Sequence, residues 1–418
     1  MNMRATILVA GLLLLSSARP SVRPTVASPA CDPSNGGLTL PAGFCAVVVA
    51  DQVGAARHIA VAANGDVFVA LAGSRAPGRS GGVLALRDTT GDGKADVSAQ
   101  FGDQGGSGLA LGRGSLFFSS ASTVYRYALH AGELTPVGPP DVVVADLPAG
   151  GHSARSVVLG PDGSLFVTVG SRSNSCQLAD RQLESPGQDP CQELATRAGV
   201  WRFDATRTGQ KQADGIRYVT GVRNAVALAL NPATGVLYAV QHGRDQLGQN
   251  WPKLFTLEQS AEKPSEEMMQ IKQGDDFGWP YCFHDPELGH LVLAPEYGGD
   301  GTQVGRCADK KAPLLAFPGH WAPDGLLFYT GDQFPARYRG GAFIAFHGSW
   351  NRAPLPQAGY RVVFVPLANG APAGGYETFA DGFQPEHRPV GLAQGPDGSL
   401  YITDDAGGRI WRVIYRGR

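Results

Sequence analysis

Short apolar runs alternate with glycine-rich turns along the chain, and the alternation repeats one unit six times. In each unit an apolar run ends at a turn, and a second apolar run follows it. Most of these turns are short and contain Asn-Gly, Asp-Gly or another glycine, which is typical of a β-hairpin. The six first runs begin at His58, Gly108, Val157, Val226, Gly325 and Gly391.

Repetition of one hairpin unit predicts the blades of a β-propeller. We therefore expect an all-β fold, a six-bladed β-propeller with four-stranded antiparallel blades. Two further apolar runs, at residues 40–50 and 408–415, have no hairpin partner nearby. We expect these N- and C-terminal strands to share one blade and close the ring, because closure removes free sheet edges.

The N-terminus has the pattern of a secretory signal, with one cation at Arg4, an apolar run over residues 7–15 and small residues after it. A membrane anchor is the less favoured alternative, since this run is shorter than the roughly 20 residues that span a bilayer. We predict a cleaved signal peptide over 1–27, a flexible leader over 28–37 and a catalytic propeller over 38–418. The mature protein is then periplasmic or secreted, without a membrane span.

Composition narrows the choice of partners. The chain has 418 residues, 17% of them charged, with a formal net charge of −2. No overall basic field favours nucleic acid, so we expect no nucleic-acid partner. The composition does not separate a monomer from a homodimer.

Six cysteines fall into three local pairs, and their even number in an exported chain favours disulfides. Fifteen pairings are possible in principle. Zinc is the weaker interpretation, because no Cys-x-x-Cys spacing occurs. The local pairs are Cys31 with Cys45, Cys176 with Cys191, and Cys282 with Cys307.

Polar residues just before each first run are expected to converge at one mouth of the central channel. Long insertions at residues 171–196, 247–267 and 281–311 should flank this mouth as loops, where binding sites are usually built. The convergent set is rich in Arg and His and poor in acids, which favours an anionic ligand. Its members are Arg57, His58, Gln104, Ser107, His152, Arg155, Arg223, Asn224, His320 and Arg388.

Five sequence motifs follow one another along the chain. They are GHSAR at 151–155, GVRN at 221–224, DFGWP at 276–280, HGSWNR at 347–352 and RPVG at 388–391. Together and in this order they resemble the glucose/sorbosone dehydrogenase family, especially its sorbosone or aldose branch. The resemblance covers nearly all of the mature chain and implies a soluble six-bladed sugar dehydrogenase that depends on pyrroloquinoline quinone (PQQ).

The resemblance also implies residue roles. His152 corresponds to the general base that accepts a proton while hydride leaves the sugar C1 hydroxyl or hydrated aldehyde for PQQ. Arg223 corresponds to the cation that stabilises the developing oxyanion, and Asn224 to its neighbour at the quinone. Arg388 and Arg352 correspond to cations for the cofactor carboxylates, and we add Arg155 and Gln104 to the cofactor set.

The family holds calcium partly through backbone carbonyls, which here belong to Gly243 and Arg244. Glu267 and Phe277 align with a second calcium site, although the family has Tyr at the latter position. The family's cofactor-binding lysine has no counterpart near residues 349–352. Separately, the Asp-rich turn at residues 88–96 looks like a calcium loop but lacks its terminal glutamate, so we expect a plain surface turn.

The leading hypothesis is a quinoprotein sugar dehydrogenase, an oxidoreductase that acts on CH–OH donors. It oxidises an aldose or sugar aldehyde and passes the electrons to an external acceptor such as a quinone, a cytochrome or a dye. The alternative is a cofactor-free extracellular binding module, since a fold does not fix an activity. A metal lactonase on a propeller ranks last, because the predicted mouth is basic.

Overall fold

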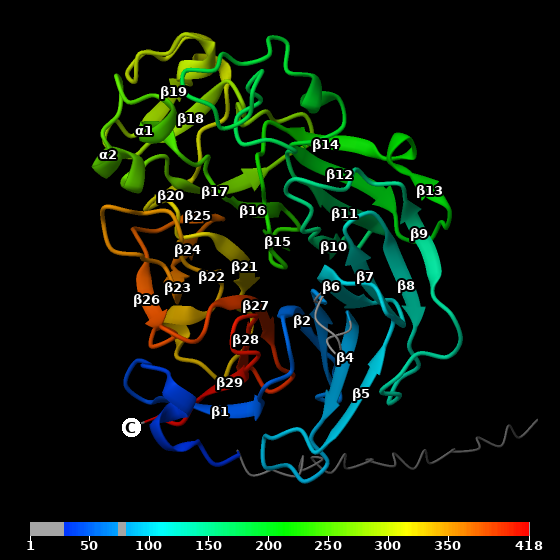
Figure 1. The fold of residues 1–418 in the computed structure, drawn as a ribbon. Helices are drawn as coiled ribbons and strands as arrows, with labels where there is room; N and C mark the ends of the chain where they lie inside the picture. The colour runs from blue at the N-terminus through cyan, green and yellow to red at the C-terminus, as the bar shows by residue number, and fades with distance from the viewer. Residues whose placement is uncertain (1–28, 74–80, 418) are drawn as a thin grey trace, which may run out of the picture.

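The structure is a computed structural model that describes residues 29–73 and 81–417. The predicted signal peptide, residues 1–27, lies outside the described residues. Six antiparallel sheets surround a central axis (Figure 1), so the predicted six-bladed propeller is confirmed.

The first five blades follow the chain, and each contains four strands from the inside outwards. The second blade gains a fifth strand, β13 (Gln210–Lys211), which adds in parallel to β9. The blades are β2 (Ala56–Val61), β3 (Val67–Leu71), β4 (Gly82–Arg87) and β5 (Val97–Phe101); β6 (Gly106–Gly112), β7 (Ser115–Ser120), β8 (Val124–Ala128) and β9 (Asp141–Ala145); β10 (Val157–Leu159), β11 (Ser164–Val169), β12 (Gly199–Asp204) and β14 (Ile216–Thr220); β15 (Ala227–Leu230), β16 (Leu237–Gln241), β17 (Glu266–Ile271) and β20 (Leu315–Phe317); and β21 (Pro323–Phe328), β22 (Ala342–Phe346), β23 (Arg361–Val365) and β26 (Glu377–Ala380).

The sixth blade joins the two ends of the chain. Its strands are β27 (Pro389–Gln394), β28 (Leu400–Asp404), β29 (Ile410–Tyr415) and, outermost, β1 (Phe44–Ala50). Strand β1 pairs with β29 in antiparallel register, with Phe44 opposite Tyr415. The predicted closure of the ring by terminal strands is therefore confirmed.

The innermost strands meet around the axis. Each packs against the innermost strands of both neighbouring blades, from β2 through β6, β10, β15 and β21 to β27 and back to β2. Their apolar side chains leave a cavity of about 320 Å³ in the channel, lined mainly by leucine, valine and isoleucine. The polar site described below therefore lies on an apolar barrel.

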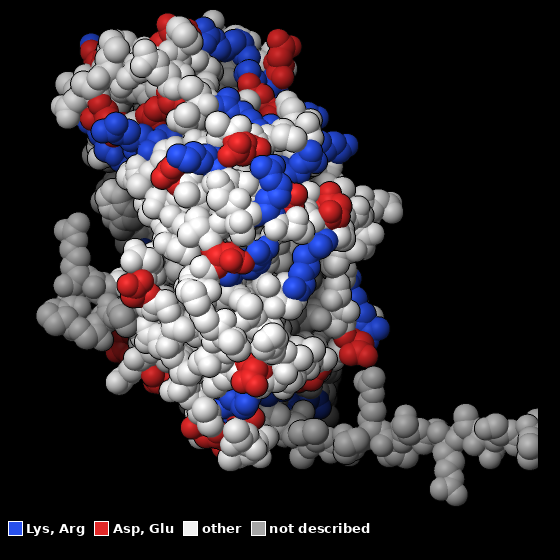
Figure 2. Space-filling view, turned by 90° about the vertical axis from the view of Figure 1, so that its right-hand side faces the viewer, with Lys and Arg blue, Asp and Glu red and all other residues white. Residues whose placement is uncertain are grey.

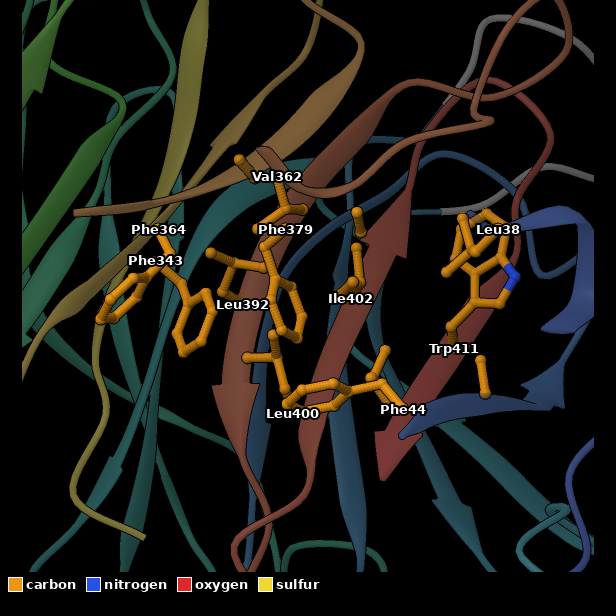
Figure 3. Close-up of a cluster of buried hydrophobic side chains, with 14 of the residues drawn as sticks. Leu38, Phe44, Phe343, Val362, Phe364, Phe379, Leu392, Leu400, Ile402 and Trp411 are labelled. Carbon is orange, nitrogen blue, oxygen red and sulfur yellow. The ribbon is translucent and has the colours of Figure 1, made fainter. Parts of the chain in front are cut away.

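Aromatic and aliphatic side chains fix the sixth blade against the fifth (Figure 3). The Phe44 ring of β1 lies 4.8 Å from the Phe334 ring and 5.1 Å from the Phe379 ring, edge to face in both cases. Burial of one such ring stabilises the fold by roughly 1.5–3 kcal/mol. The N-terminal strand is thus held by packing as well as by its pairing with β29.

The insertions gather over one part of the ring (Figure 1) and carry some regular structure. The prediction of loops is corrected for residues 281–311, which contain a hairpin of β18 (Cys282–Asp285) and β19 (His290–Leu293). Short helical elements also occur in all three insertions, and further short elements lie in other parts of the chain. They are α1 (Leu247–Asn250), α2 (Leu257–Glu262), β24 (Leu367–Ala368), β25 (Ala371–Pro372) and the 3₁₀ turns η1 (Pro33–Gly37), η2 (Gln192–Ala195), η3 (Gln212–Asp214), η4 (Pro295–Tyr297), η5 (Gly305–Asp309) and η6 (Ala336–Tyr338).

Three disulfides join the predicted pairs, Cys31–Cys45, Cys176–Cys191 and Cys282–Cys307. The first attaches the segment before β1 to β1 itself, and the Asp32 carboxylate also accepts a hydrogen bond from the Val48 amide at 2.6 Å. The other two lie within insertions. The predicted boundary between a leader over 28–37 and the propeller stays a prediction.

Charged side chains of both signs lie beside one another on the face shown in Figure 2, with wide uncharged areas between them. Across residues 29–73 and 81–417, none of the helices has the length and apolar character needed to cross a membrane. In the Asp-rich turn, the Asp88 carboxylate accepts hydrogen bonds from backbone amides of the turn itself, such as those of Gly91 and Gly93 at 2.7 Å.

Candidate active site

His152 lies in the loop between β9 and β10, at the end of the channel that the insertions flank. Its Nδ1 is 3.0 Å from the Ser171 carbonyl oxygen and 2.9 Å from the Ser171 hydroxyl. Burial, and then the nearby Arg223 guanidinium, lower the pKa of His152 to about 3. The ring is therefore neutral near pH 7, as a general base requires.

Arg223 lies beside this histidine, in the loop between β14 and β15, and is almost fully buried. Its guanidinium donates to the Asn174 carbonyl at 3.1 Å, to the Gly243 carbonyl at 2.8 Å and to the Asp245 carboxylate at 3.1 Å. Burial lowers the pKa of Arg223, while the Asp245 charge opposes that shift. The guanidinium is thus a fixed cation, held by the insertion at residues 171–196 and by the segment that follows β16.

Asn224 follows Arg223 and supplies an unpaired polar atom. Its side chain is buried, and Oδ1 has no hydrogen-bond donor within the described chain. A Cβ added at Gly170 would lie 2.7 Å from the His152 Cβ and 3.1 Å from Asn224 Oδ1. His152, Gly170 and Asn224 therefore lie side by side. A buried oxygen that lacks a hydrogen-bond donor fits a ligand that supplies a donor.

Asp245 connects the two sides of the site. Its carboxylate accepts from Arg181 at 2.8 Å, from Arg223 at 3.1 Å and from the Asn351 amide at 2.8 Å. Burial alone would raise the pKa of this carboxyl, but Arg223 and Arg181 hold it well below its usual range. Asn351 also contacts His320 at 3.3 Å, so the fifth blade is linked to Arg223 through Asp245.

Two arginines of the predicted cofactor set are engaged elsewhere. Arg155 is fully buried and donates to the carbonyls of Ala121, Pro148 and His152. Arg352 donates to the carbonyls of Ala261 at 2.7 Å and Gly319 at 2.8 Å, and forms an ion pair with Glu262. Both guanidinium groups therefore hold loops in place.

Arg388 and Gln104 have different surroundings again. Arg388 is partly exposed and donates from Nε and Nη2 to carbonyls of residues 347–349, with its Nε 3.1 Å from the His347 oxygen. Gln104 is exposed and bonds the Asp103 carboxylate at 3.2 Å. It lines a groove with Tyr125 and Pro136 at the β5 and β8 side of the blades, apart from His152.

The predicted calcium ligands are only partly grouped. Gly243 and Arg244 follow β16, and the Gly243 carbonyl already accepts from Arg223. Glu267 is buried with Oε2 unpaired, and burial raises its pKa to about 8. Phe277 packs in an apolar cluster with residues such as Val222. Within the described ranges, no three His, Cys, Asp or Glu side chains form a group that could hold a metal ion.

The mouth is richer in acids than the sequence predicted. Arg57 bonds Asp405 at 2.6 Å and Asp324 at 3.0 Å, while His242 Nε2 lies 3.0 Å from Asp324 and His347 Nε2 lies 2.8 Å from Asp405. Burial alone would lower the pKa of His242, but the Asp324 hydrogen bond and charge outweigh it and raise that pKa. The prediction of a mouth poor in acids is therefore wrong.

The missed residues have a common origin. In an antiparallel hairpin the end of the second strand lies beside the start of the first. The predicted convergent set was drawn only from the starts of the first strands, so it left out the positions that follow second strands. Those positions hold Ser171 after β11, His242 after β16, His347 after β22 and Asp405 after β28. Asp324 was itself available, directly before Gly325.

This geometry, a neutral histidine and a fixed arginine at one mouth of a six-bladed propeller, is that of a polar active site on a rigid scaffold. A family model described as TrAA12-like matches residues 38–416. The chain therefore belongs to the TrAA12-like family.

Its relatives include sugar dehydrogenases. It is 24% identical over 331 residues to the pyrroloquinoline quinone-dependent sugar dehydrogenase of Hypocrea jecorina, which covers 73% of each chain. It is 22% identical over 336 residues to the aldose sugar dehydrogenase YliI of Escherichia coli, covering 76% of this chain and 72% of that protein. A match to a Coprinopsis cinerea pyranose dehydrogenase is 30% identical but covers only 32% of this chain and 22% of that protein.

Solved structures agree on the fold. The calcium structure of the Trichoderma reesei family AA12 protein has a TM-score of 0.74 at 21% identity, covering 91% of this chain and 97% of that one. The holo PQQ domain of Coprinopsis cinerea pyranose dehydrogenase has a TM-score of 0.73 at 19% identity, covering 90% and 97%. The predicted family resemblance and the predicted class, an oxidoreductase of the quinoprotein sugar dehydrogenase kind, are confirmed.

Proposed function

We propose that this protein oxidises the C1 hydroxyl of an aldose, or a hydrated sugar aldehyde, with pyrroloquinoline quinone as its cofactor. The observation that carries this proposal is the state of the His152 ring. Because Nδ1 is engaged by Ser171, Nε2 is left to accept a proton beside Arg223 and the unpaired Asn224 oxygen.

The residues around His152 fit the quinone end of such a cofactor. Asn224 Oδ1 is buried without a donor, and the absence of a side chain at Gly170 lets His152 and Asn224 pack closely on either side of it. When bound, the quinone supplies a carbon that accepts hydride. His152 takes the hydroxyl proton at Nε2, and the Arg223 charge stabilises negative charge that develops nearby.

The cofactor carboxylates have fewer partners than the sequence predicted. Arg388 is the one of the three arginines that is partly exposed, and its hydrogen bonds within the chain use only Nε and Nη2. Arg388 is therefore the proposed carboxylate ligand. Arg155 and Arg352 are proposed as structural residues, since each holds several backbone carbonyls.

Calcium is proposed to bind only together with the cofactor. Gly243 and Arg244 offer backbone carbonyls, and Arg223 already donates to the first of these. A carbonyl oxygen has a second lone pair that can face an ion, but two carbonyls do not fill the six to eight positions that calcium takes. Further oxygens must come from the cofactor and water. A second ion at Glu267 and Phe277 stays a prediction.

The direct test is reconstitution. The purified protein is mixed with PQQ and calcium, a panel of aldoses and sugar aldehydes is added, and reduction of a dye is followed. Several sugars should reduce the dye, and His152→Gln should lower the rate by at least about 100-fold, in the range of a lost general base. The matched control is His290→Gln, at a histidine on the exposed end of β19. Dye reduction that is equal in both variants would refute the proposal.

Cofactor binding is tested separately by absorbance after removal of unbound quinone. The alternative, a binding module without a cofactor, predicts no retained quinone and no calcium-dependent stabilisation. The external electron acceptor is proposed to be a quinone, a cytochrome or a dye. Three disulfides support a periplasmic or secreted location, since such bonds persist in oxidising compartments.

A further inference from the structure

Ser171 forms hydrogen bonds with both His152 and Arg223, the base and the cation of the candidate site. It follows β11 after one residue and is completely buried. Its carbonyl oxygen faces both the His152 amide nitrogen at 2.9 Å and the His152 Nδ1 at 3.0 Å. Its own amide donates to the Arg223 carbonyl at 2.8 Å. One serine thus connects the base and the cation of the site.

The direction of each hydrogen bond at Ser171 is determined. The hydroxyl has a single proton, which it donates to the Ser173 carbonyl at 2.7 Å. Its oxygen can therefore only accept from His152 Nδ1, 2.9 Å away. The Ser171 carbonyl oxygen can also only accept. Two acceptors converge on Nδ1, so this nitrogen carries the proton.

We infer that Ser171 is the positioning residue that fixes His152 as the Nδ1–H tautomer and leaves the Nε2 lone pair for the substrate. The inference rests on the proposed role of His152 as base. A histidine base commonly has a carboxylate at this place, which orients the ring and also stabilises its protonated form. Ser171 supplies the orientation without the charge.

The charged groups around His152 agree with a ring that is oriented by Ser171 and has no carboxylate bonded to it. His152 faces Arg223, His242 and Asp245, and its backbone carbonyl accepts from Arg155. Asp245 is the nearby acid, but its carboxylate is occupied by Arg181, Arg223 and Asn351. No carboxylate bonds the His152 ring among the described residues. The protonated ring is therefore short-lived and returns its proton readily.

The test is nuclear magnetic resonance of the protein without cofactor, with ¹⁵N-labelled histidine rings and His152→Gln to assign the signals. We expect His152 to carry hydrogen on Nδ1 and to show no titration between pH 5 and pH 8. Ser171→Thr keeps the hydroxyl and should preserve this tautomer. Ser171→Asp adds the missing charge and should raise the titration midpoint by at least one unit, with the acid limb of sugar oxidation moving by the same amount.

Ser265→Ala is the matched control, because Ser265 is also fully buried and its hydroxyl lies 2.9 Å from Nδ1 of another histidine, His284. This variant should change the His284 signals and leave those of His152 unchanged. Hydrogen on Nε2 of His152 in the unmodified protein would overturn the inference, whether or not Ser171→Asp folds. So would an unshifted midpoint in folded Ser171→Asp.

The two proposals fail separately. The ring measurement needs neither quinone nor sugar, so an Nδ1–H tautomer in a protein that oxidises no sugar would contradict only the proposed function. An Nε2–H tautomer in a protein whose dye reduction depends on His152 would contradict only the role of Ser171.

Discussion

Replacing Asp245 by Asn should destabilise the protein strongly although it changes a single atom of the side chain. One carboxylate oxygen accepts from both Arg181 and Arg223, and the other accepts from Asn351. An amide keeps an acceptor on one side only, so its NH₂ group meets a donor on the other. Both arginines also lose the negative charge that compensates them.

The size of the effect follows from burial. Breaking a buried ion pair by removing one partner typically costs about 3–5 kcal/mol. The side chains of Asp245 and Arg223 are 15% and 4% exposed, so we expect a loss near the lower end, about 3 kcal/mol. The matched control is Asp141→Asn, whose carboxylate is 54% exposed and pairs with Arg126. Surface pairs contribute roughly 0–1 kcal/mol.

The assay is equilibrium unfolding in urea at several pH values. The folded state holds the pKa of Asp245 below that of the unfolded chain, which is about 3.9. Its stabilising effect is therefore complete above that pH and declines as the pH falls further. The gap between the unmodified protein and Asp245→Asn should narrow below about pH 4. A gap at pH 7 no larger than that of Asp141→Asn would refute the reasoning.

Three further outcomes are expected. Glu267→Gln should stabilise the protein at pH 8. Burial raises the pKa of Glu267 to about 8, so the free energy of unfolding falls as the pH rises from about 4, the pKa in the unfolded chain, and a neutral Gln avoids this loss. Unfolding midpoints measured in a chelator should show the gain, and a loss of stability at pH 8 would contradict it. Replacing both cysteines of the Cys176–Cys191 disulfide by Ser should lower stability by about 3 kcal/mol, the value for a loop of some 15 residues, and an unchanged denaturation midpoint would count against that role. Calcium alone should not raise the melting temperature, whereas calcium with PQQ should, because the described residues form no group of three His, Cys, Asp or Glu side chains that could hold a metal ion. A rise with calcium alone would contradict the proposed shared site.

The fold was predictable because its signal is local and repeated. Each blade begins with two apolar runs and a glycine turn, and the unpaired strand runs at both ends predicted the closure between β1 and β29. His152, Arg223 and Asn224 entered the predicted site because they stand a few residues before first strands.

The rest of the site depends on contacts that sequence position does not reveal. Asp245 and Asn351 come from different blades and meet only in the folded protein, 2.8 Å apart. Arg155 and Arg352 look like free cations along the chain, but folding directs them to backbone carbonyls. Which backbone carbonyls are left to accept a hydrogen bond from an arginine depends on the geometry of the loops, and the residue pattern does not encode that geometry.

The shared blade of β1 and β29 also constrains how the chain can fold during synthesis. Strand β1 emerges first from the ribosome, but its pairing partner lies more than 350 residues later, with Phe44 opposite Tyr415. Until the last strand is made, β1 has no pairing partner and the ring cannot close, so the early blades remain in an incomplete ring. Completion of the mouth that carries the candidate site is thereby tied to completion of the polypeptide, because a chain that stops before β29 cannot form the sixth blade.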